Sequence, residues 1–323
     1  MGILTDSHYD ENTWRTQAYR SYRNLNNILY IQTNVDAIAA LGDNVDSEHK
    51  DKAINIANLE RFCERFSEGI NKEKFIIRGN HDMGALVWDT TNSGNKVFAK
   101  DVLTGPEQLG IFKKHFNQEG KVYGSEGQYH YKDYPNKKVR LVFIDTLDNS
   151  MATNSNGTLK YVDQWNYGFQ NTQLNWIASE ALGTLQDDYH VMILSHVPIM
   201  PDSVTSDPIT NADVLKKILN AFVNKSNGTF TSSAPDFQSS VTVDYRNRQQ
   251  SNLVGLFGGH RHAEYFYDMN GYYSTVLDCA FVRDGSKIGT TEEDAFCVLE
   301  INTNSRTVTR KGFGRQSDKQ YTY

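Results

Sequence analysis

Six short apolar runs divide most of the chain, and they limit the folds that it can adopt. Each run has the length and composition of a strand buried on both faces, which is typical of parallel sheets. The runs occupy residues 2–5, 35–41, 74–78, 139–145, 190–195 and 253–258. Helix-like segments lie between them, at residues 13–31, 48–70, 105–118, 172–185 and 211–225. Strands that alternate with helices predict βαβ units, and therefore an α/β protein with largely parallel strand pairing at first.

The pattern changes after residue 260. Segments such as "YFYDMNGYYSTVLDC" and "RTVTRKGF" alternate apolar and polar residues as antiparallel strands do. We therefore expect the second half of the chain to build a second sheet that packs on the first.

Three stretches are rich in Asn, Ser, Thr and Gly and lack clear periodicity, which predicts long surface loops at residues 84–104, 146–170 and 226–250. No internal repeat or linker-like tract interrupts the chain, so residues 1–323 are expected to form a single domain. The first apolar run starts at residue 2, whereas a strand of about five or six residues would begin further upstream. This abrupt start is consistent with a domain excised from a longer protein.

Five of the apolar runs are followed at once by a polar cluster. The clusters are Asp6-Ser7-His8, Gly42-Asp43-Asn44, Gly79-Asn80-His81-Asp82, Ser195-His196 and Gly259-His260-Arg261-His262. The carboxyl ends of strands in an open α/β sheet converge on one crevice, so these distant clusters are expected to meet there. Residues two apart in an extended chain point to the same side, so the pairs Asp6/His8 and His260/His262 can each grip a ligand from one direction.

The clusters offer four His, two Asp and one Asn as metal ligands, and no Cys. Seven protein ligands are too many for one ion and suit two, and the nitrogen and oxygen donors favour Mn, Fe, Zn, Co or Ni over thiolate-bound zinc. Two divalent ions with two carboxylates and a bridging hydroxide would leave about one positive charge in the crevice. Because the chain has a net charge of −6, that centre would be a local attractor for phosphate. Paired metals clamp phosphoryl groups and activate water, so hydrolysis of a phosphate ester is predicted.

The ordered series DSH, GDN, GNHD, SH and GHRH resembles the motifs of the calcineurin-like metallophosphoesterase superfamily, from residue 3 to about residue 314. The resemblance implies a four-layer α/β/β/α sandwich of two mixed sheets with two divalent or trivalent transition-metal ions at one edge, most readily Mn, Fe or Zn. It implies the following ligands: Asp6, His8 and His262 at the first metal, Asn80, His196 and His260 at the second, and Asp43 between the two.

The same resemblance assigns chemistry to the residues beside the ligands. His81 matches the family's catalytic histidine, which contacts the phosphate and protonates the leaving oxygen, and Asp82 is expected to keep it oriented. Asn80, His81 and Arg261 are the expected substrate contacts. The resemblance thus implies attack on the phosphorus by a metal-activated hydroxide.

Several residues around the motifs admit more than one role. Asp82 also fits a cap of the helix that follows it. Arg78 and Arg261 fit strand-end ion pairs better than phosphate contacts. Asp46 and His49 fit either partners of the metal ligands or a solvated helix start.

A non-catalytic alternative is a structural or tail module in which the metals only tie strand ends together. An uncoordinated His81 beside the ligands argues against it, because a structural site has no use for a general acid.

The substrate class is open at this point. The chain has "GDNVDSE" where classical Ser/Thr protein phosphatases carry GDxVDRG, so a phosphodiesterase is favoured over a protein phosphatase. A phosphomonoesterase or a nucleotide phosphodiesterase is the alternative. The stretches "TDSHYD", "YHYKDYPNKKVRLVFIDT" and "RTVTRKGFGRQSDKQYTY" are similar to metallophosphoesterase domains of tail or prophage-associated proteins of low-GC Gram-positive phages. That similarity implies a virion-associated protein that acts on a cell-wall phosphodiester polymer such as teichoic acid.

Charge and hydropathy narrow the partners. The 33 Lys and Arg residues are outnumbered by 39 Asp and Glu and form no basic run, which disfavours nucleic acid or an anionic membrane as a partner. No stretch approaches the roughly 18 apolar residues of a membrane span, and the first residues lack the features of a signal peptide, so a soluble, cytoplasmic protein is expected from the chain as written. Cys63, Cys279 and Cys297 have no CxxC spacing and are expected to be reduced and buried.

Overall fold

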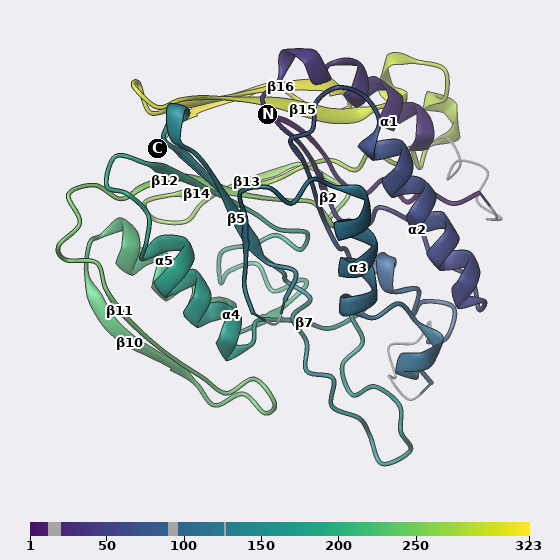
Figure 1. The fold of residues 1–323 in the computed structure, drawn as a ribbon, viewed down its shortest axis with the longest axis horizontal. Helices are drawn as coiled ribbons and strands as arrows, with labels where there is room; N and C mark the ends of the chain where they lie inside the picture. The colour runs from purple at the N-terminus through teal and green to yellow at the C-terminus, as the bar shows by residue number, and fades with distance from the viewer. Residues whose placement is uncertain (12–20, 90–95, 126) are drawn as a thin grey trace.

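The structure is a computed structural model that describes residues 1–11, 21–89, 96–125 and 127–323, and two large mixed sheets form its centre (Figure 1). The first sheet has the strand order β17-β16-β15-β1-β2-β3. Its strands are β1 (Gly2–Leu4), β2 (Ile38–Leu41), β3 (Lys74–Ile77), β15 (Ala295–Asn302), β16 (Thr307–Gly314) and β17 (Lys319–Thr322). Strands β1, β2 and β3 are parallel, whereas β15 joins β1 antiparallel and β16 and β17 continue outward as a meander.

The second sheet has the order β13-β14-β12-β8-β6-β5-β4. Its strands are β4 (Lys121–Tyr123), β5 (His130–Tyr134), β6 (Val139–Phe143), β8 (His190–Leu194), β12 (Asn252–Gly258), β13 (Tyr265–Asp268) and β14 (Tyr273–Val276). Strands β6, β8, β12 and β14 are parallel, and antiparallel strands flank them on both sides. The six apolar runs all form strands of these two sheets, so that prediction is confirmed.

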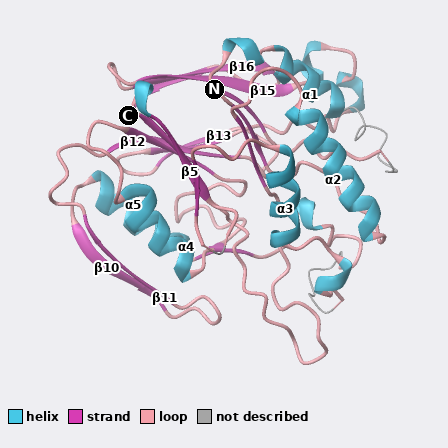
Figure 2. Cartoon of the chain, in the orientation of Figure 1, coloured by secondary structure: helices cyan, strands magenta, loops and turns pink. Residues whose placement is uncertain are grey.

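Helices cover the outer face of each sheet (Figure 2). Helices α1 (Ser21–Tyr30), α2 (Lys52–Ser67) and α3 (Gly105–His115) pack on the first sheet, and α5 (Ala212–Val223) and α4 (Asn171–Trp176), which continues as a π-helix over Ile177–Leu182, pack on the second. Short 3₁₀ helices lie at Gln32–Asn34, His81–Met83, Ala99–Asp101, Pro135–Lys137, Gly285–Lys287 and Thr291–Glu293. The order helix, sheet, sheet, helix is the predicted four-layer sandwich.

Strand residues alternate between two cores, which explains why the runs are apolar throughout. In β2, Ala39 and Leu41 face the core between the two sheets, whereas Ile38 and Ala40 face the helices. The core between the sheets also holds Phe143 of β6 and Phe257 of β12. Every side chain of a strand that is buried on both faces packs in a core, so the polar side chains lie beyond the end of the strand.

One expectation about the second half of the chain holds in part, and another is wrong. Strands β8, β12, β13 and β14 of the second half do help to build the second sheet, but β15, β16 and β17 join the first sheet instead. Residues 226–250 are not a loop, because β10 (Asn227–Ser232) and β11 (Ser239–Asp244) form an antiparallel hairpin. Val241 and Val243 alternate with exposed residues along β11 and pack into the core of the second sheet, a period of two that the Ser and Thr content concealed.

The other two predicted loops are mostly irregular. The region 84–104 is described except for residues 90–95, and it carries one 3₁₀ turn. The region 146–170 ends in β7 (Tyr167–Gly168), which pairs with β9 (Ile209–Thr210). The helix expected over residues 13–31 is described only from residue 21 onward, since residues 12–20 lie outside the described ranges.

Two further expectations concern the cysteines and the membrane. Cys63, Cys279 and Cys297 are free thiols in the interior, as predicted. Within the described ranges, no helix combines the length and the hydropathy that crossing a bilayer requires.

Candidate metal centre

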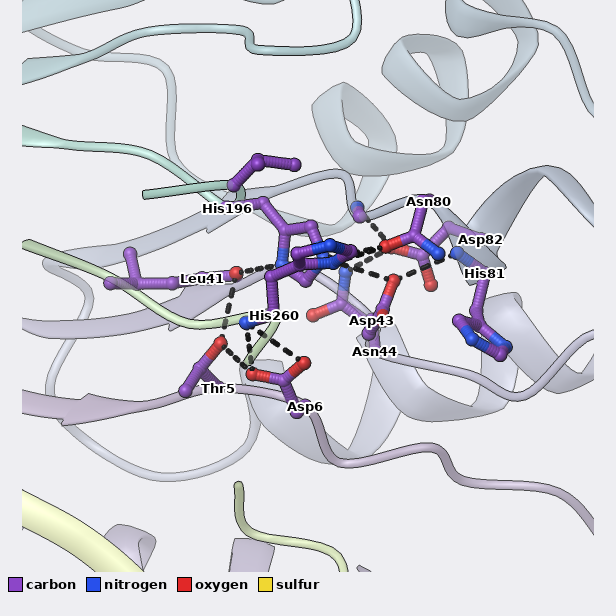
Figure 3. A network of polar contacts seen from close by, with 12 residues as sticks. Thr5, Asp6, Leu41, Asp43, Asn44, Asn80, His81, Asp82, His196 and His260 are labelled. Carbon is purple, nitrogen blue, oxygen red and sulfur yellow. Dashed lines mark hydrogen bonds and ion pairs between the residues drawn. The ribbon is translucent and has the colours of Figure 1, made fainter. Parts of the chain in front are cut away.

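The five polar clusters meet where the carboxyl ends of β1, β2, β3, β8 and β12 come together (Figure 3). Hydrogen bonds join the two sheets at this edge. His196 Nδ1, after β8, lies 2.8 Å from the carbonyl oxygen of Leu41 at the end of β2. The backbone N–H of His260, after β12, donates to Asp6 Oδ2 at 2.9 Å, after β1. The site is therefore built from the ends of both sheets.

One group of ligand atoms gathers around two imidazoles. The Nε2 atoms of His8 and His262 are 3.0 Å apart. His262 Nε2 lies 3.1 Å from Asp6 Oδ1, and His8 Nε2 lies 3.6 Å from Asp43 Oδ2. Each of these four residues offers one atom within 4.8 Å of the others. Ring nitrogens that face one another beside two carboxylates form a donor set that fits a divalent cation.

A second group lies on the other side of Asp43. Asn80 Oδ1 is 2.8 Å from His260 Nδ1 and 3.0 Å from His196 Nε2, and Figure 3 shows these three side chains converging. His196 Nε2 is also 3.3 Å from Asp43 Oδ1. Asp43 therefore turns one carboxylate oxygen toward each group. The structure brings all seven predicted ligand positions together, in the two sets that the family resemblance implies.

Charge in the centre is balanced between carboxylates and imidazoles. Burial lowers the pKa of His196, but the Asp43 carboxylate outweighs it and raises that pKa to about 9. Burial likewise opposes ionisation of His262, and the Asp6 carboxylate raises its pKa to about 10. Burial also works against the Asp43 carboxylate, yet His196 and the neighbouring histidines hold its pKa well below the ordinary value. Cations are thus favoured next to both carboxylates.

The backbone is strained at the centre itself. Five of the seven positions have a left-handed backbone without being glycine, with φ values of 55° at Asp6, 46° at His8, 46° at Asp43, 68° at His260 and 52° at His262. Non-glycine residues adopt this region rarely, and each such residue costs roughly 1–3 kcal/mol unless the surroundings compensate. Five of the thirteen such residues in the described ranges are proposed ligands at this one edge of the sandwich, which indicates a functional reason for the turns there.

Glycines precede the ligands because there is no room for a side chain. A Cβ atom at Gly79 would lie 2.0 Å from the backbone nitrogen of Asp43. At Gly259 it would lie 2.0 Å from Thr5 Oγ1 and 2.3 Å from Asp6 Oδ2. The close approach of the strand ends therefore requires glycine at both positions.

His81 lies at the rim of the centre. Its backbone N–H donates to Asp43 Oδ1 at 2.8 Å, and its ring packs edge-on against that of His8, with centroids 4.6 Å apart. Its Nδ1 is 3.6 Å from Asp46 Oδ1 and has no hydrogen bond in the described structure. Burial lowers the pKa of His81 to about 4, against the opposing effect of Asp43. An anion bound beside the ring would raise that value.

Asp82 does not orient His81 by the contacts that the structure records. Its carboxylate accepts hydrogen bonds from the N–H groups of Gly79 and Val45, at 2.8 and 3.0 Å, and from Asn44 Nδ2 at 2.8 Å. Burial raises the pKa of Asp82 to about 7, and the Asp43 carboxylate adds to the effect. Asp82 thus ties the turn after β2 to the turn after β3, and the carboxylate beside the His81 ring belongs to Asp46.

The residues beyond Asp43 take up partners close to the centre. Asp46 Oδ1 lies 3.1 Å from His8 Nδ1, on the edge of the ring opposite the centre, which fixes the ring's orientation. His49 Nε2 instead lies 2.7 Å from Asp10 Oδ2. Neither side chain belongs to a solvated helix start, which was the alternative expectation.

Both arginines next to the motifs are engaged by carboxylates. Buried Arg78 donates to Asp145 Oδ2 and to Asp163 Oδ2, each at 2.7 Å. Burial alone would lower the pKa of Arg78, and these two carboxylates raise it instead. Arg261 forms an ion pair with Asp207. The ion-pair interpretation therefore holds for both, and a substrate contact by Arg261 stays a prediction.

The sequence analysis missed Asp145 and Asp207. Asp145 ends a sixth apolar run, which is much the same signal that identified the other clusters, whereas Asp207 lies in an irregular segment that carries no such signal.

Arg78 should be essential for stability because it neutralises two buried carboxylates. We expect Arg78→Met to lower the free energy of unfolding by about 3–5 kcal/mol, since Asp145 and Asp163 would be left buried without their partner. Urea denaturation of the two proteins measures the difference. Arg246→Met is the matched control, because its ion pair with Asp244 is exposed and the urea midpoint should not move. Equal midpoints for both variants would contradict the expectation.

Comparison with known proteins places the chain. The sequence profile described as calcineurin-like phosphoesterase matches residues 1–264. The chain belongs to this family. Calcineurin-like phosphoesterases use a dinuclear centre of divalent metal ions, and the His and Asp groups described above could hold them.

Solved structures show that the fold is shared. A dimetal phosphatase from Danio rerio superposes with a TM-score of 0.59 at 16% sequence identity, over 100% of this chain and 98% of that one. A protein of Thermus thermophilus gives a TM-score of 0.44 at 10% identity, over 96% of each chain. Phosphopantetheinyl hydrolase from Mycobacterium tuberculosis gives 0.34 at 12% identity, over 86% of this chain and 89% of that one. The similarity to the Danio rerio protein shows the shared fold. No curated protein matches the chain.

Proposed function

We propose that this calcineurin-like phosphoesterase hydrolyses a phosphodiester at a two-metal centre held by the seven converging side chains. The observation that carries the proposal is the position of Asp43. Its Oδ2 lies 3.6 Å from His8 in one ligand group and its Oδ1 lies 3.3 Å from His196 in the other. A carboxylate placed in this way can be shared by two ions.

Each ligand group has its own set of donors. Asp6, His8 and His262 would hold one ion, Asn80, His196 and His260 the other, and Asp43 both. When bound, two divalent ions lower the pKa of a water molecule and stabilise the charge that develops on the phosphoryl oxygens. The donors are nitrogen and oxygen, which supports Mn, Fe or Zn.

His81 is the proposed proton donor. Its ring lies at the rim of the centre and its Nδ1 faces the buried carboxylate of Asp46 at 3.6 Å. An anionic substrate adds a second negative neighbour, which favours the protonated ring. The ring would then transfer its proton to the leaving oxygen, and Asp46 takes the orienting role first expected of Asp82.

A cavity beside the centre can receive a substituent of the phosphate ester. A cavity of about 420 Å³ shares Asn80, His81 and His260 with the centre. The preference for a diester rests instead on the sequence, which lacks the GDxVDRG signature of classical Ser/Thr protein phosphatases. The cell-wall polymer and the phage-tail setting stay predictions that rest on the sequence resemblance.

The first test compares two synthetic esters. The protein is stripped of metal and reloaded with Mn, Fe, Zn, Co or Ni in turn, and hydrolysis of bis-p-nitrophenyl phosphate is measured against p-nitrophenyl phosphate. We expect faster turnover of the diester with at least one metal. Preference for the monoester would make the chain a phosphomonoesterase. Two bound ions per chain without turnover of either ester would favour the non-catalytic alternative.

A further inference from the structure

The cavity beside the candidate metal centre has walls that the proposed hydrolysis does not use. Beyond the three residues it shares with the centre, it is lined by Leu86, Gln164, Trp165, Tyr167, Asp207 and Pro208. Four of these six are aromatic or apolar. The lining therefore changes from a polar, metal-binding side to an apolar side within one cavity.

The two aromatic rings are held in place by their own polar atoms. Trp165 Nε1 donates to the carbonyl oxygen of Asp89 at 3.1 Å, and the Tyr167 hydroxyl donates to that of Gln164 at 3.2 Å. The Tyr167 ring also lies edge-on to His260, with centroids 5.2 Å apart. Because the polar atoms are already satisfied, the rings offer mainly their carbon surfaces to a ligand.

The segment that carries this wall is held in place by a buried ion pair. Asp163, two residues before Trp165, accepts from Arg78 at 2.7 Å, and Arg78 itself follows β3 two residues before Asn80. The apolar wall and one side of the metal centre are thus tied to the same buried arginine. A wall fixed in this way binds a rigid group at little entropic cost.

Gln164 adds a hydrogen-bonding group to the wall. The residue is only 3% exposed, and its Oε1 has no hydrogen-bond partner in the described structure. Leaving this oxygen without a partner costs about 1–3 kcal/mol, which rotation of the amide toward a ligand in the cavity would recover. Whichever way the amide is turned, a ligand edge that carries both donor and acceptor groups can satisfy it.

The charge of the cavity excludes a second anionic group. None of the described residues that line it is Lys or Arg, and its carboxylate, Asp207, is paired with Arg261. A further phosphate or carboxylate would find no cation there. The wall fits a neutral group that is flat and has hydrogen-bonding edges.

We propose that this cavity binds the leaving substituent of the diester as a nucleoside, with its base stacked on Trp165 and hydrogen-bonded by Gln164. The inference rests on the proposed function, because the phosphate must sit at the metal centre for the substituent to enter the cavity past His81. A nucleobase supplies the planar face, the neutral charge and the polar edge that the wall requires, and every base can stack on an aromatic ring.

Binding of three phosphates to the metal-loaded protein tests the proposal. Adenosine 5′-monophosphate, uridine 5′-monophosphate and ribose 5-phosphate share the phosphate and the sugar, so the metals contribute equally and only the base differs. By calorimetry we expect at least one of the two nucleotides to bind roughly 5- to 150-fold more tightly than ribose 5-phosphate. Equal affinity of all three would overturn the proposal.

Variants test whether the tighter binding of the nucleotides comes from the apolar wall. Trp165→Ala should bring the nucleotides close to the affinity of ribose 5-phosphate, and Gln164→Leu should remove a smaller part of the difference. Trp88→Ala is the matched control, because Trp88 packs against the same hydrophobic cluster as Trp165 but does not line the cavity. A uniform loss for all three ligands in Trp165→Ala, or an equal loss in the control, would count against a base-binding role.

Failure of the metal centre is distinguishable from failure of the cavity. If ribose 5-phosphate does not bind at all, the centre fails, and adenosine and ribose then test the cavity without a phosphate. Quenching of tryptophan fluorescence by adenosine but not ribose, absent in Trp165→Phe, supports the cavity. Equal spectra with adenosine and ribose overturn it.

Discussion

Replacement of Asp43 by Asn should remove both metal ions and lower turnover by roughly three powers of ten or more. Asp43 places one oxygen in each ligand group, so the change withdraws a negative charge from two ions at once. Replacing a residue that only orients a ligand already costs about 10–100-fold in affinity or activity, and a shared ligand must cost more. Metal content by atomic emission and hydrolysis of bis-p-nitrophenyl phosphate measure the two effects.

Asp46→Asn is the graded comparison for this prediction. Asp46 lies 3.1 Å from His8 Nδ1 and outside both proposed ligand sets, so its loss should weaken metal binding by only about 10–100-fold. If Asp43→Asn retained two ions per chain with full turnover, the shared position of Asp43 would have no catalytic meaning. An equal loss of bound metal in the two variants would show that Asp43 does not bridge the two ligand groups.

His81→Ala should lower turnover by roughly two to four powers of ten while both ions stay bound. The side chain lies at the rim of the centre and is proposed to give a proton to the leaving oxygen. Its loss should therefore matter most for substrates whose leaving group needs that proton. Comparison of a methyl ester with a p-nitrophenyl ester measures this difference, because p-nitrophenolate leaves readily without a proton.

His81→Asn controls for the shape of the side chain, because the backbone N–H to Asp43 and much of the volume remain. Metal content should equal that of the unchanged protein in both variants. Equal losses for the two esters would indicate that His81 only positions the phosphate. Loss of the ions themselves would mean that His81 supports the ligand groups instead.

The meeting of the proposed ligands could be predicted from sequence because strand ends are a topological property. A strand such as β3 is apolar on both faces, so Asn80 and His81 just beyond it must lie at the edge of the sheet. Parallel strands bring such residues to the same edge whatever the details of packing. The position of each motif at the end of a strand is therefore enough to predict that the motifs lie close together.

The wall of the cavity could not be predicted in the same way. Trp165 and Gln164 lie in an irregular segment whose course depends on the contact of Arg78 with Asp163, 85 residues away in sequence. No period or motif encodes such a contact. The same limit explains why the role of Asp82 was not predicted. Its carboxylate joins the turns after β2 and β3, and the sequence does not show that these turns touch.

The hairpin of β10 and β11 shows a different limit. Its outer face is built from Ser and Thr, whose composition is typical of loops, although Val241 and Val243 keep the period of a strand. Composition and period disagreed, and the buried face decided the structure.

The left-handed backbone at five proposed ligand positions sets stability against activity within this one protein. Glycine would relieve the roughly 1–2 kcal/mol that an L-residue incurs in this conformation, against about 0.5–1 kcal/mol of added chain entropy. A descendant of this chain that no longer needed catalysis could therefore become more stable by accepting glycine at Asp6, His8, Asp43, His260 and His262. The presence of Asp and His at all five turns indicates that function keeps the sequence less stable than it could be.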